Sequence, residues 1–296
     1  MKNNKKRVGI ILAGGQGSRL FPITLSTCKQ LLPIYNKPLI YYPLSVLLLA
    51  GIREILIIST RRDLPRFKYL FGDGSQLGLD IKYKIQPSPG GLAQAFILGE
   101  EFIANRPSAM ILGDNLFYSS GLSNTLSEAN EGAKGATIFG YAVNRELAMQ
   151  YGMIALDPQG NITGIEEKPE NPSSNIAVTG LYFYDNSVCK MAKTLKPSKR
   201  GEIEISDLNS LYLKKGNLDV VLLNRGCTWL DTGSPNQLMQ AANFVQTIEE
   251  RTGFKVACIE EICYDKGWIT KNQLAKLANR VNNSDYGTYL QSILRN

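Results

Sequence analysis

The chain has 296 residues, 44% of them hydrophobic, and its 33 lysines and arginines outnumber its 26 aspartates and glutamates, for a formal net charge of +7. This length and composition suffice for a large buried core, which excludes a disordered chain, and the apolar runs fall short of the roughly 18 residues that a membrane-spanning helix needs. Because the sequence has no histidine, histidine catalysis and histidine-ligated metals are also excluded, and any metal must be held by oxygen atoms.

The positive charge favours anionic partners. The basic residues are spread along the chain and form no stripe interleaved with aromatic residues, so we expect small phosphorylated ligands and no nucleic acid. The five cysteines are scattered without C-x-x-C spacing, which is typical of reduced thiols, and the basic N-terminus shows no signal-peptide cleavage site. We therefore expect a cytoplasmic protein with no membrane partner.

The first half of the chain alternates short apolar runs with helical patterns. The continuous apolar run Val8–Ala13 predicts a strand buried on both faces, and Tyr41–Ala50 predicts a buried helix that stops at Gly51. Further strands are expected at 54–59, 81–85, 109–112 and 136–143, with a helix at 92–103. Strand, helix and strand in series predict an α/β protein with right-handed crossovers and a doubly wound sheet.

From about Tyr151 the pattern changes to short strands separated by turns, expected at 153–156, 162–166 and 180–184, which predicts added mixed or antiparallel strands. Helical patterns return at 187–195, 205–215 and 235–250, and most of the sequence beyond Phe254 has amphipathic helical spacing. We expect one α/β domain over residues 1–240 and a C-terminal helical appendage, 241–296, packed on the same domain.

The loop Gly14-Gly-Gln-Gly-Ser-Arg19 follows the first strand directly. Glycines let backbone N–H groups approach a phosphate, and the next helix would add its positive end, so the loop predicts a phosphate site; the alternative is a plain tight turn. A dinucleotide fingerprint is excluded because Leu20 replaces its third glycine, and no Gly-Lys-Ser or Gly-Lys-Thr follows for a Walker loop. Arg19 and nearby Lys29 are placed to neutralise a bound triphosphate, unless they are an ordinary exposed pair.

Two aspartates follow apolar strands. Asp114 lies just beyond the carboxyl end of a buried strand, the edge where doubly wound sheets hold ligands, and Asp231 occupies a turn after a second strand. If the two carboxylates converge they form an oxygen site suited to Mg²⁺, the ion that accompanies triphosphates; if not, each is a turn or capping residue. Lys168, held extended before Pro169, is a candidate anchor for a sugar phosphate or part of a solvated turn.

Taken together, several blocks of the sequence, in order, resemble the glucose-1-phosphate thymidylyltransferase family from about residue 7 to the C-terminus. The blocks are Leu12-Ala-Gly-Gly-Gln-Gly-Ser-Arg-Leu20, Lys29-Gln-Leu-Leu-Pro33, Gln86-Pro-Ser-Pro-Gly-Gly-Leu-Ala-Gln94, Gly113-Asp-Asn115, Glu166-Glu-Lys-Pro169, Val178-Thr-Gly-Leu-Tyr-Phe-Tyr184 and Trp229-Leu-Asp-Thr-Gly233. The resemblance implies a Rossmann-like nucleotidyltransferase fold, dTTP and α-D-glucose 1-phosphate as substrates, and dTDP-glucose and pyrophosphate as products. It also implies a homotetramer, a place in dTDP-sugar biosynthesis and feedback control by a downstream dTDP-sugar.

The resemblance also assigns roles to individual residues. At the nucleotide it places Gly14, Gly17, Ser18, Arg19, Lys29 and Gln30 near the triphosphate, Gln86 and Gly91 at the base, and Asp114 and Asn115 beside them. At the sugar it places Tyr151, Gly152, Glu167, Val178 and Trp229, with Lys168 on the sugar's phosphate. Asp114 and Asp231 are assigned to Mg²⁺. Arg19, Lys29, Asp114, Lys168 and Asp231 are thereby the expected catalytic residues.

Three short stretches depart from the family's usual sequence. Gly90 stands where aspartate is common, Met153-Ile-Ala replaces Val-Val-Glu, and Ser234-Pro-Asn replaces Thr-His-Asp. The first leaves the choice of pyrimidine open and the second, next to the sugar pocket, leaves the hexose open. A UTP-dependent or other-hexose enzyme is therefore the nearest alternative, followed by a non-catalytic sugar-nucleotide sensor and a nucleic-acid binder.

Overall fold

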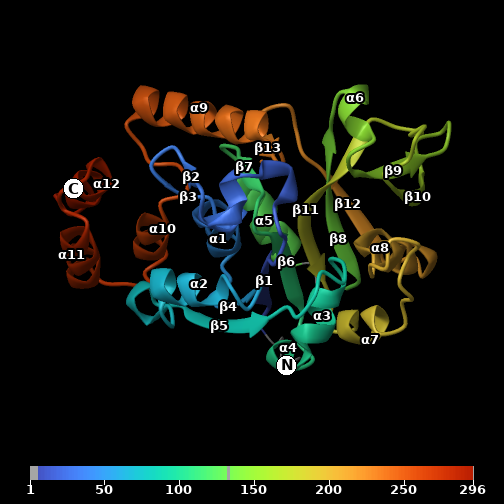
Figure 1. Ribbon diagram of the computed structural model, residues 1–296, viewed down its shortest axis with the longest axis horizontal. Helices are drawn as coiled ribbons and strands as arrows, with labels where there is room; N and C mark the ends of the chain where they lie inside the picture. Colours follow the sequence, from blue (N-terminus) through green and yellow to red (C-terminus); the bar gives the residue numbers. More distant parts are fainter. Residues whose placement is uncertain (1–5, 132–133, 296) are drawn as a thin grey trace.

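The computed structural model describes residues 6–131 and 134–295, within which the main sheet has nine strands. Its parallel centre consists of β1 (Val8–Ala13), β4 (Glu54–Ser59), β5 (Asp80–Ile85) and β6 (Ser108–Leu112), with β1 between β6 and β4. Figure 1 shows this centre surrounded by helices. The predicted α/β class with a mostly parallel sheet is confirmed.

The second half of the chain extends the sheet with antiparallel strands. The long strand β11 (Ile176–Tyr184) pairs antiparallel with β6, with β8 (Ala136–Ala142) and with β9 (Gly152–Leu156). At the margins, β10 (Ile162–Glu167) pairs antiparallel with β9, and β12 (Leu218–Leu222) runs parallel to β8. The expected change from parallel to mixed pairing is therefore present, although β12 was not predicted.

Helices cover both faces of the sheet. Along β1, Ile11 and Ala13 belong to one hydrophobic cluster, whereas Ile10 and Leu12 belong to another, as expected when successive side chains of a strand point to opposite faces. The first cluster includes α1 (Tyr41–Leu49), α2 (Leu64–Phe71) and α5 (Leu122–Glu131); the second includes α3 (Gln94–Leu98), α4 (Glu100–Ile103), α7 (Val188–Ala192) and α8 (Ile205–Lys214). This arrangement is doubly wound.

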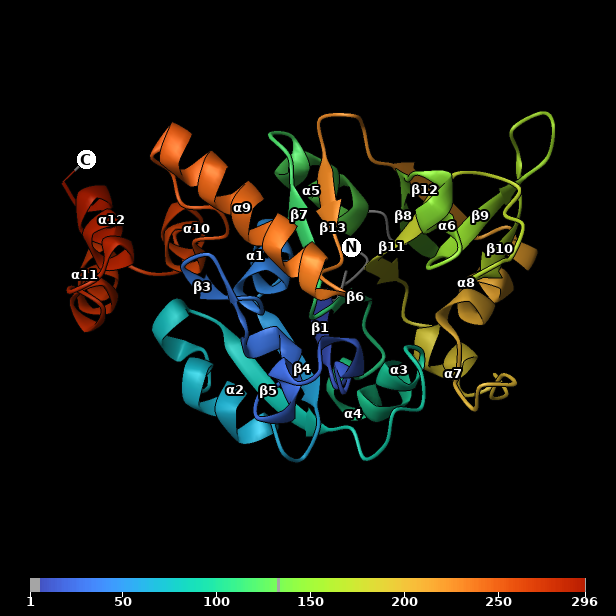
Figure 2. The same cartoon turned by 45° about the horizontal axis from the view of Figure 1, so that its top comes forward.

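Four helices form the last part of the chain: α9 (Pro235–Thr252), α10 (Ile259–Asp265), α11 (Lys271–Arg280) and α12 (Asp285–Ile293). Helices α11 and α12 lie at the end of the molecule opposite β9 and β10 (Figures 1 and 2). The expected division at residue 240 falls inside α9 and stays a prediction about folding units. Among the described helices, none combines the length and the apolar character needed to cross a membrane.

A buried ion-pair group holds this C-terminal segment against the hairpin of β2 (Pro33–Ile34) and β3 (Lys37–Pro38). Glu249, only 4% exposed, lies 2.9 Å from Lys37 Nζ and 3.0 Å from Lys255 Nζ, and it accepts a 2.6 Å hydrogen bond from Asn36 Nδ2. Burial by itself raises the pKa of Glu249, but the two ammonium groups and the amide outweigh it and lower the pKa overall.

Candidate active site

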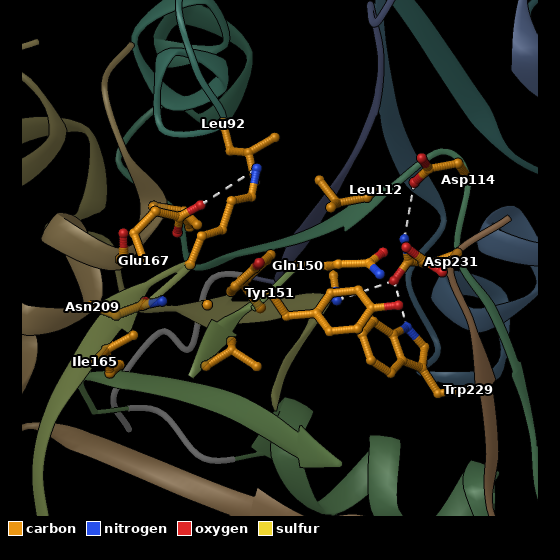
Figure 3. Close-up of a pocket in the computed structure, with 18 of the residues that line it drawn as sticks. Leu92, Leu112, Asp114, Gln150, Tyr151, Ile165, Glu167, Asn209, Trp229 and Asp231 are labelled. Carbon is orange, nitrogen blue, oxygen red and sulfur yellow. Dashed lines mark hydrogen bonds and ion pairs between the residues drawn. The ribbon is translucent and has the colours of Figure 1, made fainter. Parts of the chain in front are cut away.

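Two short strands far apart in the sequence bring the predicted acidic residues together. Strand β7 (Leu116–Tyr118) pairs antiparallel with β13 (Thr228–Leu230), with Leu116 opposite Leu230. Asp114 precedes β7 and Asp231 follows β13, so the pairing places both at one end of this ribbon. The hydroxyl of Thr232 donates to the Asp114 carbonyl oxygen at 2.9 Å and closes that end. Both carboxylates line the same cavity, and Figure 3 shows them on one side of it.

A buried ammonium group joins the two acidic residues. Lys29, 5% exposed, lies with Nζ 2.7 Å from Asp114 Oδ2 and 3.2 Å from the main-chain oxygen of Asp231. This is not the ordinary exposed lysine that the sequence left as an alternative. A buried charge needs partners, and here the partners are two elements of the candidate site. Arg19, by contrast, is exposed and lines the cavity at its rim.

The Asp231 carboxylate is held by neutral donors. Gln237 Nε2 donates to Asp231 Oδ1 at 2.6 Å, and the Tyr151 hydroxyl also bonds to this carboxylate. Burial, and after it the charge of Asp114, raise the pKa of Asp231, whereas the Tyr151 hydrogen bond and the Lys29 charge act in the opposite direction. A cation bound beside both carboxylates would offset the negative charge of Asp114 that raises the pKa of Asp231, so the arrangement favours a bound cation.

The donor set fits magnesium. Mg²⁺ is commonly held by one or two carboxylates and completes its shell with water and substrate phosphate oxygens. Asp114 and Asp231 supply two carboxylates in one cavity, and across residues 6–131 and 134–295 no group of three or more acidic or thiol side chains is arranged to hold a metal on its own. The metal role of both residues stays a prediction.

Asn115 connects the Asp114 carboxylate to the wall of the cavity. It is 2% exposed, and its Nδ2 donates to Asp114 Oδ1 at 2.9 Å. Its Oδ1 accepts from Trp229 Nε1 at 2.6 Å and from the Gly180 backbone N–H at 3.1 Å. The Asn115 amide therefore orients the Asp114 carboxylate and the Trp229 indole ring, and together with the Gly180 N–H it joins three separate segments of the chain.

The cavity that Asp114 and Asn115 line has a volume of about 200 Å³ and is called the first cavity below. Tyr151 and Trp229 form part of its wall, with ring centroids 5.0 Å apart, and Glu167 lies across the cavity from them (Figure 3). The predicted site residues on its wall are Arg19, Asp114, Asn115, Tyr151, Gly152, Glu167, Lys168, Val178, Trp229 and Asp231. Every residue predicted at the sugar thus lies on one cavity.

A second cavity, of about 210 Å³, adjoins the first at Asp114 and lies against the glycine-rich loop. The residues predicted at the nucleotide that line it are Gly14, Gln30, Gln86, Gly91 and Asp114. Gln30 is 4% exposed, and its Oε1 has no hydrogen-bond partner in the described part of the chain. An unsatisfied buried acceptor costs about 1–3 kcal/mol, so a ligand that donates to it would bind favourably.

The glycine-rich loop differs from expectation in one respect. It does not lead into an α-helix: Ser18–Leu20 is a single 3₁₀ turn, and the next α-helix begins at Tyr41. The predicted contribution of a helix's positive end is therefore wrong, and the phosphate site stays a prediction that rests on the backbone N–H groups of the loop. Gly17 has φ of +63°, which glycine adopts without strain. Gly17 and Ser18 lie outside the walls of both cavities.

Lys168 lies in an unusual backbone conformation at the rim of the first cavity. The extended conformation expected for Lys168 before Pro169 is wrong, because its φ is +47°, a left-handed value that costs a non-glycine residue of order 1–3 kcal/mol. The conformation is stabilised by its backbone N–H, which donates to the Tyr151 oxygen at 3.1 Å. The side chain is 47% exposed and lies 4.0 Å from Glu167, so its ammonium remains accessible to an anion.

Several residues at the first cavity were not anticipated from the sequence, and three polar ones, Ser206, Asn209 and Gln237, bear on its chemistry. Ser206 and Asn209, on α8, line the first cavity, and the Ser206 hydroxyl and Asn209 Nδ2 are buried with no hydrogen-bond partner among the described residues. Gln237, which holds Asp231, lies in the first turn of α9. The signal that the sequence offers for the first two is that polar residues share one face of the predicted helix over 205–215 with Ile205 and Leu208.

Comparisons with known proteins identify the family of the chain. The nucleotidyl transferase family model matches residues 8–248. The chain is 52% identical to a glucose-1-phosphate thymidylyltransferase of Xanthomonas campestris pv. campestris, with 98% of each chain covered. It is 38% identical, with a TM-score of 0.73, to a Bacillus anthracis protein provisionally named glucose-1-phosphate thymidylyltransferase and solved with sucrose, over 80% of this chain and 94% of that one.

A more distant structure is a UDP-glucose pyrophosphorylase complexed with UDP-glucose, which is 26% identical with a TM-score of 0.73 and covers 82% of this chain and 99% of that one. The match of the family model and the identity to the curated relative extend over most of the chain. The chain therefore belongs to the nucleotidyl transferase family, and its resemblance to the glucose-1-phosphate thymidylyltransferases is confirmed.

Proposed function

We propose that the protein is a glucose-1-phosphate thymidylyltransferase, which transfers the thymidylyl group of dTTP to α-D-glucose 1-phosphate and releases pyrophosphate. The observation that carries this proposal is that Asp114 lines both cavities. A nucleotide in the second cavity and a sugar phosphate in the first would meet at this carboxylate. The name of the curated relative, which aligns with nearly the whole chain, supports the choice of substrates.

In the reaction, an oxygen of the sugar phosphate attacks the α-phosphorus of dTTP in line with the leaving group. A new P–O bond forms, and the bond from the α-phosphorus to the oxygen that bridges to the β-phosphorus breaks, with pyrophosphate taking the electron pair. Because a sugar phosphate is already ionised at neutral pH, the step needs no general base. This agrees with a chain that has no histidine. Positioning and charge neutralisation supply most of the acceleration.

Different charged side chains would position the substrates and neutralise their charge. Lys29 is fixed between Asp114 and Asp231 and presents its ammonium beside the second cavity, Arg19 lies at the rim, and Lys168 faces the end where the sugar's phosphate would enter. Asp114 and Asp231 would hold Mg²⁺, which when bound neutralises the charge of the phosphates. Asn115, Gln237 and Tyr151 keep the two carboxylates oriented through the hydrogen bonds described above.

The sugar ring would occupy the first cavity between Trp229 and α8. The Ser206 hydroxyl and Asn209 Nδ2 have no hydrogen-bond partner in the described part of the chain, and Glu167 lines the same cavity. Hydroxyl groups of a hexose can satisfy such groups, and a site with buried polar atoms discriminates strongly against a ligand that leaves them unpaired. A polar hexose therefore suits this cavity better than an apolar ligand.

The proposal is tested by pyrophosphate release from a panel of dTTP, UTP, dCTP and ATP combined with glucose, galactose and mannose 1-phosphates. We expect the highest kcat/KM for dTTP with glucose 1-phosphate and no release when either substrate is omitted. A higher kcat/KM with UTP or another sugar would replace the proposal with the neighbouring pyrophosphorylase activities. Tight binding of dTDP-glucose without turnover would replace it with a sensor.

We further propose a cytoplasmic homotetramer that supplies dTDP-glucose for dTDP-sugar biosynthesis. The location is supported by the five cysteines, each of which is a buried free thiol. The tetramer is supported by the family resemblance alone. Light scattering on the purified protein would decide it, since a mass of one or two chains at working concentration contradicts a tetramer.

A further inference from the structure

The loop between β5 and α3 holds Gln86, the residue proposed to contact the base. Gln86 is 8% exposed, and its backbone N–H donates to the Ser59 oxygen at 2.8 Å, which anchors the residue to the end of β4. A Cβ added at Gly14 would lie 1.9 Å from Gln86 Oε1, so this oxygen faces the α-carbon of Gly14. The amide therefore lies over the glycine-rich loop, on the wall of the second cavity.

The orientation of this amide is set by a second glutamine. The backbone N–H of Gly90 donates to Gln94 Oε1 at 3.2 Å, and because a backbone nitrogen can only donate, the atom of Gln94 that faces it is the oxygen. The same oxygen accepts from Gln86 Nε2 at 2.9 Å. The nitrogen of the Gln86 amide consequently points to Gln94, and its oxygen points to Gly14. The groups of Gln86 that remain free to bind a ligand are its Oε1 and the second N–H of its Nε2.

We propose that Gln94 is a positioning residue that holds the Gln86 amide in one orientation and thereby sets which pyrimidine the site accepts. Thymine and uracil present an N3–H donor beside a carbonyl acceptor, whereas cytosine presents an N3 acceptor beside an amino donor. An amide pairs with either edge, but the two require amides rotated by 180° from each other. Rotation of Gln86 would place its oxygen against Gln94 Oε1, acceptor against acceptor. This inference rests on the proposed function, in which Gln86 contacts the base.

Gly90 provides the space that Gln94 needs. A Cβ at position 90 would lie 2.4 Å from Gln94 Nε2 and 2.6 Å from its Cδ. Gly90 has no left-handed backbone conformation, so its lack of a side chain serves this contact and not the backbone. Its carbonyl oxygen accepts from the Ile203 N–H at 2.8 Å, which fixes the loop on the opposite side. A residue that adds bulk at position 90 without an acceptor, such as alanine, is therefore expected to displace the Gln94 amide and release Gln86, whereas the aspartate that is common there in the family brings an acceptor of its own.

The first test compares Gln94→Leu with Gln94→Glu, because leucine removes the acceptor and glutamate retains it. Dissociation constants for dTTP and dCTP are measured by calorimetry in the presence of Mg²⁺. In the leucine variant we expect the preference for dTTP over dCTP to fall about tenfold, the effect of losing roughly one hydrogen bond in a buried site, with the KM for glucose 1-phosphate unchanged. The glutamate variant should keep the wild-type preference. A leucine variant that keeps the preference within about twofold, or a glutamate variant that loses it equally, overturns the proposal.

The second test leaves both glutamines in place. Gly90→Ala should reproduce the loss of preference, whereas the control Gly121→Ala should not, because a Cβ at Gly121 meets no atom within 4 Å. Thermal unfolding of both variants checks that the fold persists; wild-type preference in a folded Gly90→Ala protein overturns the proposal. If the wild-type protein shows no preference for dTTP over dCTP, the proposed function fails. If the wild-type protein prefers dTTP and Gln94→Leu shows the same preference, only the proposed role of Gln94 fails.

Discussion

Lys29 Nζ lies 2.7 Å from Asp114 Oδ2, a buried ammonium against a carboxylate that lines both cavities. The pair couples the segment after the glycine-rich loop to the end of β6. Because Lys29 also contacts the Asp231 backbone, the two acidic residues share one cationic neighbour while their carboxylates stay in the cavity. The charge balance of the site therefore depends on both aspartates.

Replacement of either aspartate should abolish catalysis without unfolding the protein. In Asp114→Asn and Asp231→Asn we expect turnover to fall on the order of 10²–10³ or more, the range found when one group that stabilises developing charge is removed. The amide keeps the size of the carboxylate, so Asp231→Asn should unfold nearly like the wild type, whereas Asp114→Asn also removes the carboxylate paired with the buried Lys29 and should unfold at a lower temperature while remaining folded in the assay. Asp219→Asn, at an exposed position on β12, serves as the control for pyrophosphate release. Near-normal turnover in both site variants would refute the metal assignment.

Lys168→Ala should mainly weaken the use of the sugar phosphate. Loss of a charge-assisted hydrogen bond costs about 1.5–3 kcal/mol, so the KM for glucose 1-phosphate should rise roughly tenfold or more while the KM for dTTP stays near its original value. The matched change Lys190→Ala removes an exposed lysine from α7 and should have no effect. If initial-rate kinetics for glucose 1-phosphate are unaltered in Lys168→Ala, the proposed contact does not exist.

Ser206→Ala should have opposite effects on stability and binding. The buried hydroxyl has no partner within the described residues, so its removal should raise the free energy of unfolding of the ligand-free protein by about 1 kcal/mol. The same change should raise the KM for glucose 1-phosphate several-fold. Ser187→Ala is the control, because that hydroxyl is 2.6 Å from Asp185 Oδ1 and its loss should destabilise. A less stable Ser206→Ala protein with an unchanged KM would contradict the assignment.

Glu249→Gln should destabilise the protein in a pH-dependent way. The change leaves Lys37 and Lys255 without their carboxylate, and breaking a buried pair of this kind costs about 3–5 kcal/mol. Since the pKa of Glu249 is lowered in the folded state, its contribution is complete above the ordinary glutamate pKa and is lost as the pH falls through the lowered one. Urea unfolding should therefore show a large difference from wild type at neutral pH that shrinks in acid.

Glu250→Gln, at the neighbouring exposed position, is the control for this experiment and should unfold like the wild type. Equal stability of Glu249→Gln and wild type at neutral pH would mean that the ion-pair group does not hold the C-terminal helices in place.

Much of the fold follows from local sequence. The apolar run Val8–Ala13 can only be a strand buried on both faces, and it is β1, between two parallel neighbours. The predicted helix over 92–103 divides into α3 and α4 at Gly99, whose α-carbon packs so closely that a Cβ would lie 3.2 Å from a Leu56 methyl group. Packing between distant segments, which no local pattern contains, decides such breaks.

The sequence predicted some residues of the candidate site and missed others. Asp114 was identified because sheet topology places ligands at the carboxyl ends of strands. Ser206 and Asn209 were not, because their positions on α8 share the buried face with Ile205 and Leu208, and burial in a sequence pattern looks the same for a core and for a cavity wall. Gln237 was missed because its effect lies in one hydrogen bond to a residue outside its helix.

The pairing of β7 with β13 has a consequence for synthesis. Asn115 and Trp229 bond to each other across 114 positions of the chain, and the same ribbon brings Asp231 beside Asp114. A polypeptide still emerging from the ribosome therefore has a glycine-rich loop and one carboxylate long before it has the second. Until translation passes β13, such a partial product has no complete centre with which to process nucleotides.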